Sequence, residues 1–218
     1  MTLPAATVAS REARRRAVAR RRSAARRRLR GLLALIAIGA AAVAVVVAMP
    51  LFQKAVNEFT LPLQHEDIIR QQAAEKHLDP ALIAAVIYAE TKFDPRPSSA
   101  GAQGLMQILP ETALFLAKRS GATTFTTADL ATPQVNIAYG SYYLRYLLDE
   151  YRGNTVLALA AYNGGEANVD RWVAQAHAAG HRFTISDIPF PETQAYVRKV
   201  LRAQHDYRHA YASALGYK

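Results

Sequence analysis

The chain has 218 residues, which is enough for one ordinary domain and an additional segment. Its net charge is +10, and residues 1–30 account for all of it with eleven arginines and one glutamate. The rest of the chain carries 16 basic side chains (27 less 11) and 16 acidic ones (17 less 1). That balance excludes the cationic surface that nucleic-acid binding needs, so we expect no nucleic-acid partner.

An uncharged run at residues 31–53 follows the arginine-rich tail and is rich in alanine, valine, leucine and isoleucine. As a helix it would be about 35 Å long, enough to cross the roughly 30 Å hydrocarbon core of a bilayer. We predict one transmembrane helix at residues 31–52. The arginines of residues 1–30 place the N-terminus in the cytoplasm, so the following domain would be periplasmic or extracellular.

Two alternatives compete with this membrane anchor. A cleaved secretory signal would have a shorter apolar region, of about 7–15 residues, followed by a cleavage site of small residues. The sequence Met-Pro-Leu-Phe at residues 49–52 is a poor site of that kind. A buried core helix would be expected to show a polar face, and the run has none. The pattern therefore favours an uncleaved anchor.

The remainder divides into a tether at residues 53–63 and a domain at residues 64–214, long enough for a sizeable core. Apolar residues recur mainly at helical spacing and no alternating strand is evident, which predicts an all-α class. One helix should begin at Pro80, with Asp79 as its N-cap, and end near Glu90. Glu90 would then terminate an apolar stripe.

Residues 92–104 contain two prolines and two glycines, which predicts a loop. The residues between 120 and 132 are polar and are expected to be irregular. Prolines and an asparagine mark the starts of most other helices, and Gly164-Gly165 marks an end. These helices are predicted at residues 110–119, 133–151, 154–161, 167–178 and 191–214.

Four short strings carry side chains suited to chemistry. The first is Glu-Thr-Lys-Phe-Asp-Pro at residues 90–95, where a carboxyl partly withdrawn from water would have a raised pKa and act as a general acid. A glutamate at a helix end can equally well turn to solvent. The second string, at residues 98–107, has glycines where a backbone could approach a ligand, followed by Gln107. The third is Ala-Ala-Tyr-Asn-Gly-Gly at 160–165, and the fourth is Pro-Glu-Thr-Gln-Ala-Tyr-Val at 191–197.

Together these strings resemble the successive motifs of the family 1 lytic transglycosylases, whose catalytic domain is of the soluble-lytic-transglycosylase (SLT) type. The family patterns are Glu-Ser-x-Phe, Gly-x-x-Gly-Leu-Met-Gln, Ala-Tyr-Asn-x-Gly and Glu-Thr-x-x-Tyr-Val. Residues 136–144 also match the family helix Asn-x-x-x-Gly-x-x-Tyr-Leu, and the resemblance covers about residues 64–207. It implies an α-lysozyme-like fold with a glycan cleft, peptidoglycan strands as substrate, and no cofactor.

Site roles follow from the resemblance position by position. Glu90 would be the only catalytic acid and base, with Tyr196 packed against it and Glu192 buried beneath the site. One cleft wall would be formed by Gly104, Leu105, Met106 and Gln107. Tyr162 and Asn163 would stand opposite, and Asn163 would contact sugar.

The chain departs from the family pattern at several positions. Thr91 replaces the usual serine and keeps a hydroxyl, which implies a supporting role beside Glu90. Glu166 and Ala167 replace a common Pro-Gly, and Gln194 replaces a frequent arginine. None of these changes removes the acid.

The resemblance implies non-hydrolytic cleavage between N-acetylmuramic acid and N-acetylglucosamine, which leaves a 1,6-anhydromuramyl end. A hydrolytic muramidase is the alternative, because glycosidases usually use two carboxylates and Asp94 lies nearby. Asp94-Pro95 is more simply a turn-forming pair. A cell-wall-binding module that has lost activity is a third possibility.

No metal site is expected. His205 and His209 lie four residues apart on the last predicted helix, but no third ligand is evident. A solvated helical face explains that pair.

Overall fold

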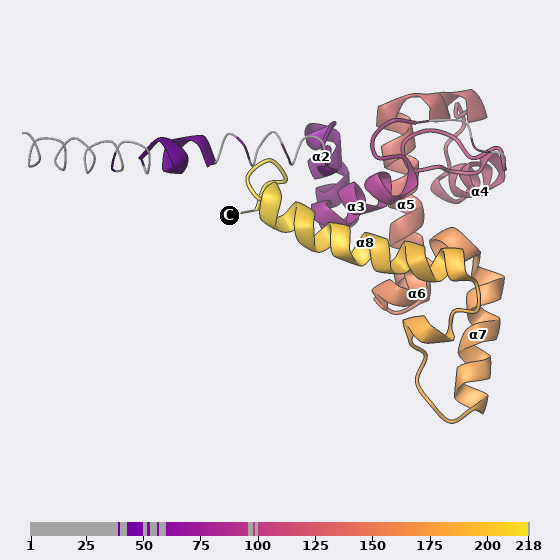
Figure 1. The fold of residues 1–218 in the computed structure, drawn as a ribbon. Coiled ribbons are helices and arrows are strands. Elements are labelled where there is room, and N and C mark those ends of the chain that lie inside the picture. Colours follow the sequence, from indigo (N-terminus) through magenta and orange to yellow (C-terminus); the bar gives the residue numbers. More distant parts are fainter. Residues whose placement is uncertain are drawn as a thin grey trace, which may run out of the picture. The chain divides into compact units, whose positions relative to one another are not determined.

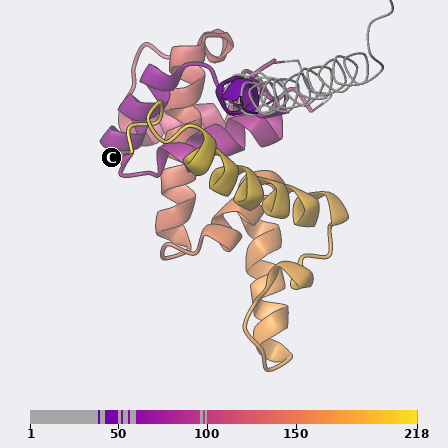
Figure 2. The ribbon, with the colours of Figure 1, turned by 60° about the vertical axis from the view of Figure 1, so that its left-hand side comes forward.

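The computed structural model describes residues 39, 43–49, 52, 56, 60–95, 98 and 100–217 (Figures 1 and 2). Most of the predicted transmembrane helix at 31–52, and all of the tail at 1–30, lies outside these residues. Residues 39, 43–49 and 52 are helical and exposed. No helix that the described residues form combines the length and the apolar character required to cross a bilayer. The chain divides into two units between Val56 and Asn57, and the description below concerns the second.

The second unit is helical, which confirms the predicted class. Its described residues form no strand, and they contain one isolated antiparallel bridge between Gln103 and Ile108. In chain order its elements are α2 (Glu66–Lys76), α3 (Pro80–Glu90), α4 (Pro110–Ser120), η1 (Thr127–Ala131), α5 (Pro133–Glu150), α6 (Thr155–Gly164), α7 (Glu166–Ala178), η2 (Ile185–Asp187) and α8 (Pro191–Ala210).

Helix α3 lies in the core rather than presenting a single apolar stripe. All seven side chains from Ala81 to Ile87 are buried. A helix that is apolar on every side is stable only when neighbours cover it, and α8 packs along its length (Figure 1). Burial decreases toward the C-terminal end of α3, so that Glu90 lies half-buried at the edge of the core.

The predicted N-cap of α3 is confirmed, and it also anchors the C-terminal segment. The Asp79 carboxylate accepts a hydrogen bond from the Ala81 N–H at 3.0 Å. It further accepts hydrogen bonds from Gln204 at 2.6 Å, from Arg208 and from the Tyr217 hydroxyl. Helix α8 ends at Ala210, four residues earlier than predicted, and the turns that follow bring the C-terminal residues back to α3.

Helices α6 and α7 form a second group, which Figures 1 and 2 show beyond the part that contains α2, α3 and α4. Helix α5 extends between the two groups and α8 packs against both α3 and α6. The Asn154 side chain caps α6 by accepting from the Leu157 N–H at 3.2 Å, as predicted. Gly165 ends α6 with a φ of 84°. The two groups meet along the cleft described next.

Candidate active site

Three hollows adjoin one another through shared lining residues, and we call them together the cleft. The first has a volume of about 490 Å³ and is lined by Glu90, Gln107 and Lys199, among others. The second, of about 380 Å³, shares Gln107 with the first and adds Tyr162 and Asn163. The third, of about 350 Å³, shares Asn163 with the second and extends to α8. The cleft therefore passes from the end of α3 to the start of α8.

Glu90 has the electrostatics of a general acid. Burial raises the pKa of its carboxyl to about 7, although the Tyr196 hydroxyl and the Lys199 ammonium act in the opposite direction. Glu192 is close enough for its negative charge to add to the increase. The carboxyl consequently titrates near neutral pH, where it can both donate and accept a proton.

Two tyrosines accompany Glu90: Tyr196 is buried and Tyr162 is partly buried. The Tyr196 hydroxyl has no partner of ordinary hydrogen-bond geometry among the described residues, and it interacts with the Glu90 carboxyl. The Tyr162 hydroxyl donates to the Met106 carbonyl at 2.8 Å. Burial raises the pKa of both phenols well above the usual value, and the nearby Glu90 charge contributes. Both therefore remain neutral hydrogen-bond donors beside the acid.

The loop opposite Glu90 is a tight turn between Gln103 and Ile108, whose backbones exchange two hydrogen bonds of 3.0 Å. Gly104 has a φ of 71°, and a Cβ there would overlap the side chain of Asn136. Only glycine satisfies both conditions. Gln107 is also left-handed, with a φ of 49°, and its amide donates to the Gly104 carbonyl at 2.9 Å.

The four predicted wall residues have three different roles. Gln107 lines the cleft, whereas the side chains of Leu105 and Met106 are buried in the core. Gly104 shapes the turn through its backbone. The resemblance alone did not indicate which of these side chains face the cleft and which enter the core.

Asn136 is a supporting residue that the sequence analysis did not assign to the site. Its buried side chain accepts from the Met106 N–H at 2.8 Å. It donates to the carbonyls of Gln103, at 2.8 Å, and Leu130, at 3.0 Å. The Asn-x-x-x-Gly pattern was the available signal, because a Cβ at Gly140 would overlap Met106 in the same turn.

Thr91 links the end of α3 to this turn. Its hydroxyl lies 2.8 Å from the Leu105 carbonyl and 3.2 Å from the Ile87 carbonyl. The hydroxyl retained at this position thus holds the acid-bearing helix against the opposite wall. The added methyl group of threonine does not prevent that contact.

Tyr162 and Asn163 lie at the end of α6 and both line the cleft. The burial predicted for Glu192 is wrong. Its side chain is exposed, because it belongs to the first turn of α8 at the rim of the third hollow. The negative charge of Glu192 raises the pKa of Glu90 without burial of its own side chain.

Asp94 and Lys199 line the same hollow as Glu90. For Asp94 the sequence favoured a turn role, and its N–H does bond to the Thr91 carbonyl at 3.0 Å. The residue nevertheless adjoins the acid. Lys199 was not identified from the sequence; its Nζ donates to the Ala89 carbonyl at 2.7 Å and lies 5.4 Å from the centre of the Tyr88 ring.

The departures from the family pattern have local partners. Glu166 accepts a hydrogen bond from the Tyr146 hydroxyl at 3.0 Å, and Gln194 donates to the Ile185 carbonyl at 3.1 Å.

The rings of His205 and His209 lie 4.4 Å apart on the exposed side of α8. Within the described part of the chain, no group of three histidine, aspartate or glutamate side chains is arranged to hold a metal ion.

Comparison with known proteins agrees with this geometry. The soluble lytic murein transglycosylase of Salmonella typhimurium is 32% identical over 157 residues, which are 70% of this chain and 24% of that protein. Membrane-bound lytic murein transglycosylase C of Actinobacillus pleuropneumoniae is 29% identical, over 67% of this chain and 46% of that protein. The chain thus spans about a quarter of the length of the soluble relatives.

Among solved structures, an inactive glutamate-to-glutamine mutant of lytic transglycosylase Slt from Pseudomonas aeruginosa is similar, with a TM-score of 0.66 and 31% identity. The match covers 72% of this chain and 26% of that one. The family model named Transglycosylase SLT domain matches residues 67–184, which contain the acid, the turn and the Tyr-Asn pair. The chain therefore belongs to the transglycosylase SLT domain family.

Proposed function

We propose that this protein is a membrane-anchored lytic transglycosylase that cuts peptidoglycan strands, with Glu90 as the single acid and base. The observation that carries the proposal is the half-buried carboxyl at the end of α3, which lines the cleft and has a pKa of about 7. The names of the relatives support the substrate class.

In the first step the protonated Glu90 gives its proton to the oxygen between N-acetylmuramic acid and N-acetylglucosamine. The bond from that oxygen to C1 of the muramyl sugar breaks, and N-acetylglucosamine leaves with a free hydroxyl. The 2-acetamido group of the muramyl sugar stabilises the cationic centre. Tyr196 and Lys199 favour the carboxylate that Glu90 becomes.

In the second step that carboxylate takes the proton from the C6 hydroxyl of the same muramyl sugar. The C6 oxygen attacks C1 and closes a 1,6-anhydro ring, so that Glu90 returns to its acid form. No water is consumed. On this proposal Gln107, Tyr162 and Asn163 hold the sugars along the cleft, since all three residues line it.

A hydrolytic muramidase is the second candidate, and the position of Asp94 is the observation that supports it. Asp94 is exposed in the hollow that contains Glu90, where a second carboxylate would be needed. The two candidates separate by product. Hydrolysis leaves a reducing end that is one water heavier than the anhydro end.

Glu90→Gln and Asp94→Asn form a matched pair of variants for this question. We expect Glu90→Gln to abolish release of soluble muropeptides from peptidoglycan, and Asp94→Asn to leave it nearly unchanged. Mass spectrometry of the wild-type products should find anhydro ends. Retained release by Glu90→Gln would indicate a different acid, and absence of release by the wild type would indicate an inactive binding module. Reducing ends together with loss of release in Asp94→Asn would establish the muramidase.

We infer that residues 31–52 anchor the domain in the membrane, with residues 1–30 inside and the catalytic domain outside the cytoplasm. The apolar run supports this proposal, as does the membrane-bound relative. Cell fractionation tests it: the intact protein should sediment with membranes and resist extraction by high salt. A soluble product that starts beyond residue 50 would overturn it.

A further inference from the structure

The exposed side of α8 carries a row of basic residues. Their side chains recur at helical spacing and therefore leave the helix in nearly the same direction. The row consists of Arg198, Arg202, His205 and His209, all of which are exposed. The carboxylate among them belongs to Asp206, which contacts His205 at 3.3 Å. We call this row the outer face of α8. The glycan cleavage proposed above leaves it without a role.

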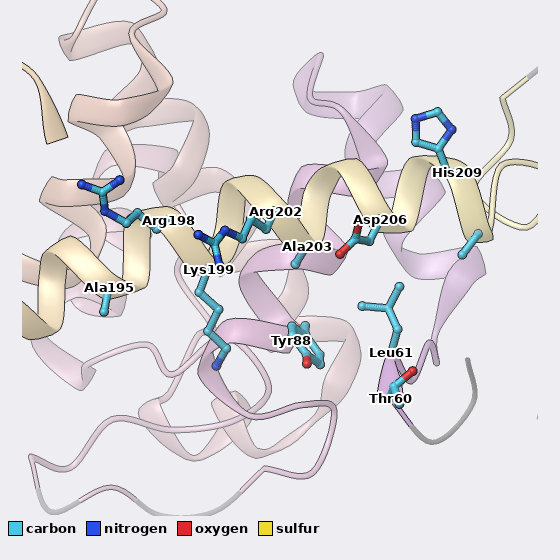
Figure 3. A pocket seen from close by; sticks show the side chains of 11 residues that line it. Thr60, Leu61, Tyr88, Ala195, Arg198, Lys199, Arg202, Ala203, Asp206 and His209 are labelled. Atoms are coloured by element: carbon cyan, nitrogen blue, oxygen red, sulfur yellow. The ribbon is translucent and has the colours of Figure 1, made fainter. Parts of the chain in front are cut away.

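The two arginines of the outer face are available to an external partner. Neither guanidinium has an ion pair or hydrogen bond with any residue that the structure describes. Figure 3 shows both side chains along the edge of α8, whereas Lys199 extends from the same helix toward Tyr88. Lys199 is fixed there by the Ala89 carbonyl at 2.7 Å. The arginines thus protrude where a broad, negatively charged surface can reach them.

The first residues of the domain lie beside the same helix. Thr60 and Leu61 line a groove of about 820 Å³ whose opposite side is α8 (Figure 3). The Tyr211 hydroxyl donates to the Leu61 carbonyl at 2.9 Å. The Tyr207 hydroxyl donates to the carbonyl of Pro62. These contacts fasten the start of the domain to the C-terminal end of α8.

The length of the tether limits how far the start of the domain can lie from a bilayer. On the proposed anchoring the membrane helix ends at residue 52, and residues 53–59 connect it to Thr60. Seven residues span at most about 25 Å when fully extended. The tether therefore keeps α8 near the headgroups and gives the bilayer a high effective concentration at its outer face. A weak attraction is then enough for docking.

We propose that the outer face of α8 docks on the anionic phospholipid headgroups of the membrane in which the protein is anchored. This inference rests on the anchoring proposed above. Anionic headgroups attract basic side chains near the surface, and guanidinium groups bind phosphate oxygens in bidentate fashion. Because α8 also carries Tyr196 and Lys199 to the site of Glu90, docking gives the cleft a fixed orientation relative to the bilayer.

An acidic strand of the cell wall is the other negatively charged partner that these arginines would attract. Two observations favour the membrane. The arginines protrude from the exposed side of a helix, and a bilayer is a broad surface that contacts protruding cations. The attachment of the first domain residues to the same helix brings only the membrane close through the chain itself.

Chemical modification of full-length protein in lipid nanodiscs tests the proposal. One kind of nanodisc contains phosphatidylcholine alone, and the other contains phosphatidylcholine with phosphatidylglycerol. Diethyl pyrocarbonate modifies exposed imidazoles, and mass spectrometry gives the rate of modification at each histidine. His205 and His209 report on the outer face of α8. His177 and His181 are internal controls, because both are exposed and neither belongs to α8.

Two double variants separate the effect of these arginines from that of positive charge in general. The test variant carries Arg198→Gln and Arg202→Gln. The matched control carries Arg152→Gln and Arg182→Gln, which remove two exposed guanidinium groups that lie outside α8 and have no partner among the described residues. Fluorescence of Trp172 checks that each variant is folded.

We expect phosphatidylglycerol to slow the modification of His205 and His209 about tenfold, which is the order of the attraction that anionic lipid gives to two surface cations. The control variant should behave like the wild type, and the rates at His177 and His181 should be the same in both kinds of nanodisc. High salt should remove the protection, because it screens exposed charges. The test variant should show no protection at either salt concentration.

Three results would overturn the proposal. The first is an equal rate of modification of His205 and His209 in both kinds of nanodisc for the wild type. The second is full protection of these histidines in the test variant. The third is protection by soluble peptidoglycan strands in phosphatidylcholine nanodiscs without any protection by phosphatidylglycerol, which would assign the outer face of α8 to the cell wall.

Failure of the anchoring looks different. If residues 31–52 do not anchor the protein, it will separate from phosphatidylcholine nanodiscs during size-exclusion chromatography. If the protein stays with both kinds of nanodisc and the rates at His205 and His209 are equal in both, only the docking of α8 is wrong.

Discussion

The side chain of Asn136 accepts a hydrogen bond from the Met106 N–H at 2.8 Å and holds the turn that faces Glu90. The same amide donates to two carbonyls, so three backbone groups of two segments depend on one buried side chain. Helix α5 is thereby connected to the cleft wall. Such a network is sensitive to removal of its centre, because its partners are then buried without hydrogen bonds.

Replacing Asn136 by alanine should lower the free energy of unfolding by about 3 kcal/mol, since it leaves buried polar groups unsatisfied. Activity should fall further than stability explains, because the turn carrying Gln107 loses its support. Denaturant unfolding followed by fluorescence of Trp172, the single tryptophan, measures the first effect. Asn154→Ala, which removes only the α6 cap, should cost about 1 kcal/mol. Equal costs for the two variants would contradict the role given to Asn136.

Two glycines in the loop allow backbone strain to be separated from steric overlap. Gly104 and Gly101 have φ angles of 71° and 79°, but a Cβ at Gly101 meets nothing within 4 Å. Gly101→Ala should therefore cost about 1 kcal/mol from the left-handed backbone alone. Gly104→Ala must also displace Asn136, and we expect a loss of about 3 kcal/mol with most of the activity. Thermal unfolding and muropeptide release are the measurements. Similar losses of stability in Gly101→Ala and Gly104→Ala would show that the Asn136 side chain moves aside at little cost.

Removing the Tyr196 hydroxyl should change the pH dependence of cleavage. That hydroxyl lowers the pKa of Glu90 against the larger effect of burial, so Tyr196→Phe should raise it. The first step needs protonated Glu90, and activity falls as pH rises through the pKa near 7. The alkaline limb of kcat/KM should consequently move to higher pH in Tyr196→Phe.

A control for that experiment is Tyr211→Phe, which removes a hydroxyl bonded to the Leu61 carbonyl at 2.9 Å at the C-terminal end of α8. Its pH profile should match that of the wild type. A shift of the Tyr196→Phe limb to lower pH would mean that the hydroxyl favours the protonated acid instead.

The sequence allowed most helices and the acid to be predicted, because prolines, Asp79 and Asn154 mark local starts and the motifs keep their order. It did not reveal α2, whose only buried side chains are Ile69, Gln72 and Ala73, too few for a clear apolar period. The sequence also did not indicate in which direction individual side chains point. Glu192 is exposed because the first turn of α8 lies at the cleft rim.

Supporting residues were missed for a related reason. Asn136 and Lys199 reach the site from α5 and α8, and their contacts with Gln103 and Ala89 join segments far apart in the chain. The Asn-x-x-x-Gly pattern marks Asn136 itself, but no local pattern indicates the distant partners of either residue. The raised pKa of Glu90 and its cause, withdrawal from water, were both expected, but the contributions of Tyr196, Lys199 and Glu192 to that pKa required the fold.

The last prediction concerns the pH dependence of stability, which we expect from the contacts of Asp79 between α3 and the C-terminal segment. Burial alone would raise the pKa of its carboxyl, but hydrogen bonds from Tyr217, Gln204 and Arg208 outweigh that effect and the pKa is lowered. The carboxylate therefore stabilises the fold above its unfolded pKa of 3.8, and this stability is lost as pH falls through the lower folded value.

Asp79→Ala removes the cap and these contacts together, and should cost about 2 kcal/mol at neutral pH. Tyr217→Phe should cost less, because the cap remains. Unfolding measured at pH 7 and again below pH 3.8 should show the gap between wild type and Asp79→Ala narrowing in acid. A gap that stays constant would mean that Asp79 acts through packing rather than charge, since packing does not titrate.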